Sequence, residues 1–198
     1  MVNETAVIRR FLRTYATLPE FADRRWVPVK KVPVGILDTA VALPKEIDLI
    51  LVEDNGNLGQ LKTLYGLREW GFSGGKRVNY GALVEQALRG GADVWIVEAE
   101  STKRKLWEAI GQSFGYRALF SANYPGATVK GCFIPYPAED GRDEAIEGAV
   151  RIINEELSVP LVILPVPKSG LDALEEEEEE YAKPRKDADL RFYGGGGA

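Results

Sequence analysis

The stretch Asp93-Val-Trp-Ile-Val-Glu98-Ala-Glu100-Ser-Thr-Lys103 decides the fold that we predict for this chain. A short apolar run ends in two carboxylates and continues into a segment with helical spacing, which is typical of a buried strand followed by a helix. Side chains alternate between the two faces of a strand, so Glu98 and Glu100 should emerge on one side and Val97 and Ala99 on the other. The two acids therefore indicate a paired oxygen site suited to a metal ion. The alternative is that they only mark where the strand leaves the core.

Apolar spacing on both sides of this stretch predicts an α/β domain with a central mixed sheet. The chain has 198 residues, 45% of them hydrophobic, which is enough for one domain with its own core. The expected elements are a helix at 4–16, strands at 26–34, 46–53 and 94–99, a helix at 103–120, a strand at 128–134, a helix at 143–157 and a strand at 159–166. Between the second and third strands we expect an insert at about 55–92, with short helices near 58–70 and 80–89 and a glycine-rich turn between them.

Charge divides the chain into a domain at residues 1–168 and a tail at residues 169–198. The tail holds nine acids and four bases, whereas the rest of the chain holds 21 of each, so the formal charge of −5 belongs to the tail. We expect this acidic tail to be disordered, and the alternative is an acidic arm that competes with nucleic acid for a basic groove. A neutral domain does not predict strong nonspecific binding to nucleic acid.

The composition excludes several kinds of chemistry. The chain contains no histidine, which excludes Ser-His and Cys-His nucleophiles, a histidine base and the usual zinc sites with imidazole. Its single Cys132 cannot form an internal disulfide. No apolar run approaches the ~20 residues of a membrane helix, and no signal peptide is evident, so we expect a cytoplasmic protein without membrane contact. The scarcity of Met and Cys beside many Arg and Glu residues is typical of thermophile proteins.

Strand geometry selects the acid that can join Glu98. Asp93 lies on the same strand, ~16 Å upstream at ~3.3 Å per residue and on the opposite face. Asp48 opens the preceding strand, and if the two strands pair antiparallel, the start of the first lies beside the end of the second. Asp48, Glu98 and Glu100 would then converge at one end of the sheet. Magnesium or manganese would suit these oxygens, since such ions commonly bind one or two carboxylates plus water and substrate phosphate.

At this point the chain resembles the PD-(D/E)XK nuclease superfamily, in particular its RecB-type branch with a QxxxY motif. That branch has an acid, then an E-x-K-like strand end, then Q-x-x-x-Y on the next helix. The matching segments here, in the same order, are Ile47-Asp48-Leu49-Ile50, Glu98-Ala99-Glu100 and Gln112-Ser-Phe-Gly-Tyr116. The resemblance covers roughly residues 26–135, and the predicted element order agrees with the restriction endonuclease-like αβββαβ core of the family.

The resemblance implies a metal-dependent nuclease that hydrolyses phosphodiester bonds in DNA. On this hypothesis Asp48 and Glu98 hold Mg²⁺ or Mn²⁺ and the backbone carbonyl of Ala99 adds a ligand. Gln112 and Tyr116 would line the substrate groove. The expected partner is therefore nucleic acid, with DNA as the first expectation, and a homodimer is left open.

One position departs from the family pattern. Glu100 stands where the family usually has the lysine that orients or activates the attacking water, although some members have Glu or Gln there. Lys103 or Lys105, one turn onward, could supply the missing positive charge, and the alternative is that both are solvated residues at a helix start. We therefore place Asp48, Glu98, Glu100 and Lys103 in the predicted catalytic group. The second hypothesis is a catalytically inactive nucleic-acid-binding or structural member of the same fold.

Overall fold

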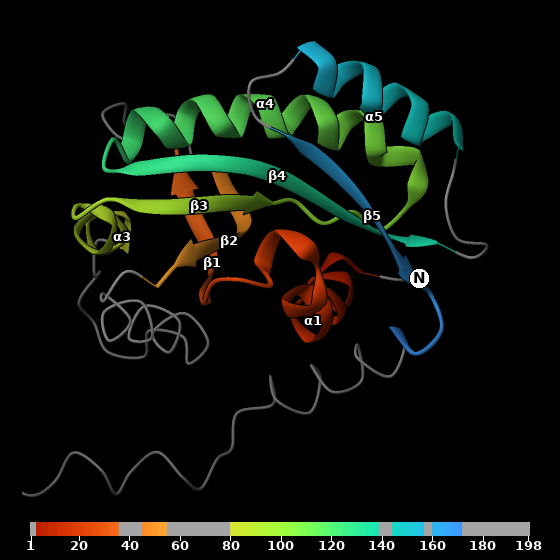
Figure 1. Ribbon diagram of the computed structural model, residues 1–198, viewed down its shortest axis with the longest axis horizontal. Helices are drawn as coiled ribbons and strands as arrows, with labels where there is room; N and C mark the ends of the chain where they lie inside the picture. The colour runs from red at the N-terminus through yellow and green to blue at the C-terminus, as the bar shows by residue number, and fades with distance from the viewer. Residues whose placement is uncertain (1–2, 36–44, 55–79, 139–143, 157–159, 172–198) are drawn as a thin grey trace, which may run out of the picture.

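The computed structural model describes residues 3–35, 45–54, 80–138, 144–156 and 160–171, which form a five-stranded mixed sheet with helices on both faces (Figure 1). In chain order, its elements are α1 (Glu4–Thr14), β1 (Trp26–Val34), β2 (Lys45–Glu53), α3 (Tyr80–Leu88), β3 (Ala92–Val97), α4 (Leu106–Asn123), β4 (Ala127–Ala138), α5 (Glu144–Glu156) and β5 (Leu161–Pro167). Short 3₁₀ turns lie at Tyr15–Thr17, Pro19–Phe21 and Lys103–Lys105. The predicted α/β class with a mixed central sheet is confirmed.

The strands lie in the order β1-β2-β3-β4-β5. The first three pair antiparallel, whereas β4 pairs parallel with β3 and β5 pairs parallel with β4. Parallel neighbours need a crossover, and α4 and α5 supply the two crossovers on one face of the sheet, with α1 on the other (Figure 1). β1, in which Pro28 and Pro33 have no backbone N–H to donate, lies at one edge of the sheet.

The core consists of two apolar layers, one on each face of the sheet. The α4-side cluster joins the sheet to α3, α4 and α5, and its largest fully buried members are Ile47, Ile50, Leu88, Ile96, Leu106, Phe120 and Ile134. The α1-side cluster joins the sheet to α1 and the Pro19–Phe21 turn through Phe11, Phe21, Leu49, Leu51, Trp95, Val97 and Phe133. From Leu49 to Val52 of β2 and from Val94 to Val97 of β3, alternate residues thus enter opposite layers.

Most predicted elements are present with shifted ends. The predicted strand at 94–99 is β3, which ends at Val97, so Glu98 to Glu100 continue past it. Along this continuation the backbone pairing that the structure describes is with β4, since the N–H groups of Glu98 and Glu100 donate to the carbonyls of Phe133 and Pro135 (both 3.0 Å). The predicted helix at 103–120 begins instead as a 3₁₀ turn and becomes α4 at Leu106.

The structure describes only part of the predicted insert and of the predicted tail. The helix expected near 80–89 is α3, whereas the helix expected at 58–70 and the glycine-rich turn after it lie outside the described residues, as does the tail from 172 onward. Leu171 is fully buried in the α1-side cluster, so packing extends beyond the predicted domain end at 168. None of the helices that the structure describes has both the length and the apolar character needed to cross a bilayer.

Candidate functional site

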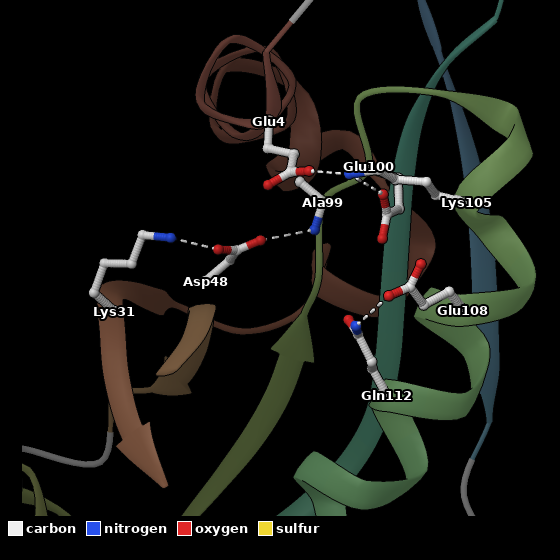
Figure 2. A network of polar contacts seen from close by, with 8 residues as sticks. All are labelled: Glu4, Lys31, Asp48, Ala99, Glu100, Lys105, Glu108 and Gln112. Carbon is white, nitrogen blue, oxygen red and sulfur yellow. Dashed lines mark hydrogen bonds and ion pairs between the residues drawn. The ribbon is translucent and has the colours of Figure 1, made fainter. Parts of the chain in front are cut away.

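Asp48 of β2 and Glu98, just after β3, meet at one end of the sheet. The last described backbone pair between these strands is Leu49 with Val97, and beyond it side chains replace the ladder. The N–H of Asp48 donates to Oε1 of Glu98 (3.1 Å), and the N–H of Ala99 donates to Oδ2 of Asp48 (3.2 Å). The second of these contacts is drawn in Figure 2. Each carboxylate is thus held by the backbone of the other strand, which fixes both in place.

Burial makes this pair of carboxylates electrostatically unusual. Glu98 is only 6% exposed, and burial followed by the nearby charge of Asp48 raises its pKa to about 9. The hydrogen bond from the Asp48 N–H and the charge of Lys31 act in the opposite direction but are smaller. Near neutral pH, Glu98 therefore favours either a proton or a neighbouring cation.

Tyr116 lies on the side of α4 that approaches this pair. It packs against the α4-side cluster, and burial, then the charges of Glu98 and Asp48, raise the pKa of its hydroxyl. Gln112, one turn earlier, donates from Nε2 to Oε1 of Glu108 on the same helix (3.2 Å; Figure 2). The charges of the carboxylate pair therefore reach the hydroxyl of Tyr116, whereas the described contact of Gln112 is with its own helix.

The sequence analysis missed Lys31 of β1. Its ammonium donates to Oδ1 of Asp48 at 2.5 Å, on the side of the carboxylate away from Ala99 (Figure 2). Burial alone would lower the pKa of Lys31, but the hydrogen bond and charge of Asp48, with smaller effects of Glu46 and Glu98, raise it. A signal was present in the sequence. Val29 and Val32 are three residues apart, whereas valines on one face of a regular strand are two apart, and this spacing indicates an irregularity at the two lysines between them.

Glu100 belongs to a second group, with Glu4 of α1 and Lys105 and Glu108 of the α4 region (Figure 2). Lys105 pairs with Glu4 at 3.2 Å and lies 4.0 Å from Oε2 of Glu100, which is buried and makes no hydrogen bond. Burial, then the charge of Glu4, raise the pKa of Glu100 to about 7, against the effect of Lys105. Asp48 is the weakest of the influences named for Glu100, so this acid is set apart from the Asp48–Glu98 pair.

The remaining predicted residues lie elsewhere. Lys103 is exposed in the 3₁₀ turn before α4, and the lysine that the structure places at Glu100 is Lys105. Asp93 forms ion pairs with Arg24 (3.0 Å) and Lys130 (3.5 Å) near the start of β3, so it belongs to the opposite end of that strand from Glu98.

The donor atoms of the Asp48–Glu98 pair suit a hard divalent ion. Both are carboxylates, and one is buried with a pKa that a cation would lower. Within the described ranges no group of three or more His, Cys, Asp or Glu side chains is arranged to hold a metal ion. An ion at this site would therefore depend on two carboxylates, with its other ligands from backbone oxygen, water and substrate, which is a common arrangement for Mg²⁺.

In comparisons with known proteins, no family model, curated protein or solved structure matches the chain. The site is therefore interpreted from its own geometry and chemistry.

Proposed function

We propose that this protein is a metal-dependent nuclease built on a restriction endonuclease-like core. The order α1, β1, β2, α3, β3, α4, β4 supports this proposal if α3 is counted as part of the insert between β2 and β3, since β1, β2 and β3 then pair antiparallel and α4 leads to a parallel β4. The observation that supports the function best is the pair of hydrogen bonds that links Asp48, inside β2, to Glu98 and Ala99, just after β3. It fixes two carboxylates side by side, one of them buried, where a cation would relieve their repulsion.

In this proposal each residue has a defined task. Asp48 and Glu98 would hold Mg²⁺ or Mn²⁺ with the carbonyl of Ala99, and a bound ion of this kind supplies Lewis-acid stabilisation of the phosphate and a more acidic water. Hydrolysis forms a bond between the water oxygen and phosphorus, breaks one ester P–O bond and transfers a proton to the leaving oxygen. Tyr116, whose pKa is raised by burial and then by the charges of Glu98 and Asp48, would contact the phosphodiester, and Gln112 would border the groove one turn away.

The experiment is cleavage of single-stranded, double-stranded and branched DNA by the purified full chain with Mg²⁺ or Mn²⁺, with chelator as the blank. We expect Asp48→Asn and Glu98→Gln to lose at least about a hundredfold in rate, since each removes a charge that holds the ion. Glu155→Gln on the exposed side of α5 is the matched control and should retain full activity. Cleavage that persists in both site variants would exclude this site as its source.

One observation favours a second candidate, a non-catalytic nucleic-acid-binding protein on the same fold. Glu100 occupies the position at which the family usually has lysine, and Lys105, the nearest described lysine to it, is also paired with Glu4. Binding of DNA by the wild-type chain without metal-dependent cleavage of any of the three substrates would support this candidate over the nuclease.

A further inference from the structure

Lys31 lies opposite Asp48 in the β1–β2 hairpin. The pairs on either side are Lys30 with Leu49 and Val32 with Ile47, so Lys31 and Asp48 are the two residues between them. Residues directly opposite in antiparallel strands are neighbours, which explains how a lysine on the edge strand reaches a carboxylate on the next one. The ammonium of Lys31 donates to Oδ1 of Asp48 at 2.5 Å, whereas Oδ2 of the same carboxylate accepts from the N–H of Ala99.

The backbone at Lys31 is distorted at this same position. Its φ is +52°, in the left-handed region that L-residues other than glycine rarely adopt. Val29 and Val32 enter the α4-side cluster although alternation would send them to opposite faces, and the same is true of Ile47 and Ile50 on β2. Both strands therefore switch faces around the Lys31–Asp48 pair while their register is kept. Strained non-glycine residues of this kind concentrate at functional sites.

The other lysine near the candidate site has a different role. Lys105 bridges Glu4 and Glu100, which joins α1 to the start of α4. Lys31 is the lysine whose ammonium contacts a member of the Asp48–Glu98 pair, and about half of its side chain remains accessible to an incoming molecule. An accessible cation beside two carboxylates lets an anionic phosphate approach a region that would otherwise repel it.

We propose that Lys31 is the charge-balancing residue of the candidate site: its ammonium offsets the charge of Asp48, so that it weakens the binding of a divalent cation and strengthens the binding of a phosphodiester. This inference rests on the proposed function, because it assigns Lys31 to the same site and the same class of substrate. It predicts opposite effects on two ligands. A residue with a purely structural role would weaken the binding of both.

The test compares Lys31→Met and Lys31→Arg in the full chain. Calorimetric titration with Mn²⁺ alone should give Lys31→Met about tenfold tighter binding than the wild type, because a neighbouring positive charge has been removed. Fluorescence anisotropy with a labelled oligothymidylate should show about tenfold weaker binding by the same variant. Lys31→Arg keeps the charge and should stay within about threefold of the wild type for both ligands.

Two further variants make the result decisive. Lys45→Met removes an exposed lysine from the same hairpin and should change neither affinity by more than about twofold. Lys31→Gly accepts the left-handed backbone without strain, so it reports the loss of the ammonium even if Lys31→Met does not fold. Mn²⁺ binding that is unchanged or weaker in both Lys31→Met and Lys31→Gly would overturn the proposal, as would a wild-type chain that binds no Mn²⁺. Cleavage is a separate readout. If Lys31→Met binds Mn²⁺ more tightly and the oligothymidylate more weakly than the wild type, but the wild type cuts no DNA, the nuclease proposal is refuted and the role of Lys31 stands.

Discussion

The backbone N–H of Asp48 donates a hydrogen bond to the carboxylate of Glu98, fifty residues further along the chain, at 3.1 Å. The return contact runs from the N–H of Ala99 to the carboxylate of Asp48. Beyond the pair of Leu49 with Val97, the backbone ladder between β2 and β3 is thus replaced by a reciprocal pair of side-chain-to-backbone bonds. This arrangement keeps two acids together against their repulsion, and several measurable properties follow from it.

Replacing Glu98 by Gln should stabilise the metal-free protein at neutral and alkaline pH. The folded-state pKa of Glu98 is about 9, above its unfolded value near 4.5, so the folded state binds one more proton between these values and the stability of the wild type falls as pH rises through that window. Gln keeps an acceptor for the Asp48 N–H but does not ionise. We expect similar stabilities at pH 4.5, with the variant roughly 1–3 kcal/mol more stable at pH 8.

Urea unfolding in the presence of chelator, at several pH values, measures this difference. Glu155→Gln, an exposed change of the same chemistry, serves as the control and should follow the wild type. Parallel pH profiles for the wild type and Glu98→Gln would show that Glu98 ionises normally in the folded protein.

Divalent metal should raise the melting temperature of the wild-type protein. An ion that binds only the folded state adds about 2.7 kcal/mol when its concentration is 100 times its dissociation constant. Asp48→Asn and Glu98→Gln should each lose most of this increment, because each leaves a single charged ligand. Differential scanning calorimetry with and without Mn²⁺ measures it, and an equal increment in Asp48→Asn would place the bound ion elsewhere.

Gly131 of β4 should not tolerate even alanine. A Cβ at this position would overlap Cζ3 of Trp95, whose ring packs between Phe21 and Phe133 in the α1-side cluster. We expect Gly131→Ala to lower the free energy of unfolding by about 2–4 kcal/mol, because a ring in a packed core cannot retreat without strain. Gly148→Ala is the matched control: its Cβ would meet open space in α5, and helix propensity predicts a gain of about 0.5–1 kcal/mol. Equal stabilities of these two variants in urea would contradict the packing described for Trp95.

Cys132 should be unreactive in the folded protein. It is buried under α4, and burial raises its pKa to about 12 despite the opposing charge of Arg117. Thiol reagents attack the thiolate, so at pH 8 we expect reaction with an aromatic disulfide to be at least about a hundredfold slower in buffer than in concentrated urea. Fast reaction of the native protein would show that the region around Cys132 opens readily.

The sequence by itself determined the elements and the acids at their ends. Apolar alternation and helical spacing located the strands and helices because these periods are properties of a few consecutive residues, as in Asp93 to Val97. The end of β3 was misplaced because Glu98 and Glu100 keep backbone bonds to β4, whereas the bonds of this segment to Asp48 of β2 involve side chains, and no local pattern records this difference.

The tertiary structure decided which charged groups act together. Antiparallel pairing joined Asp48 to Glu98, and a left-handed residue opposite Asp48 added Lys31, which the sequence analysis had not considered. Lys105, which pairs with Glu4 of α1, lies beside Glu100 and sets this acid apart from the Asp48–Glu98 pair. Such assignments depend on contacts between residues far apart in the chain, and a single strand pairing or helix packing changes them without altering any local periodicity.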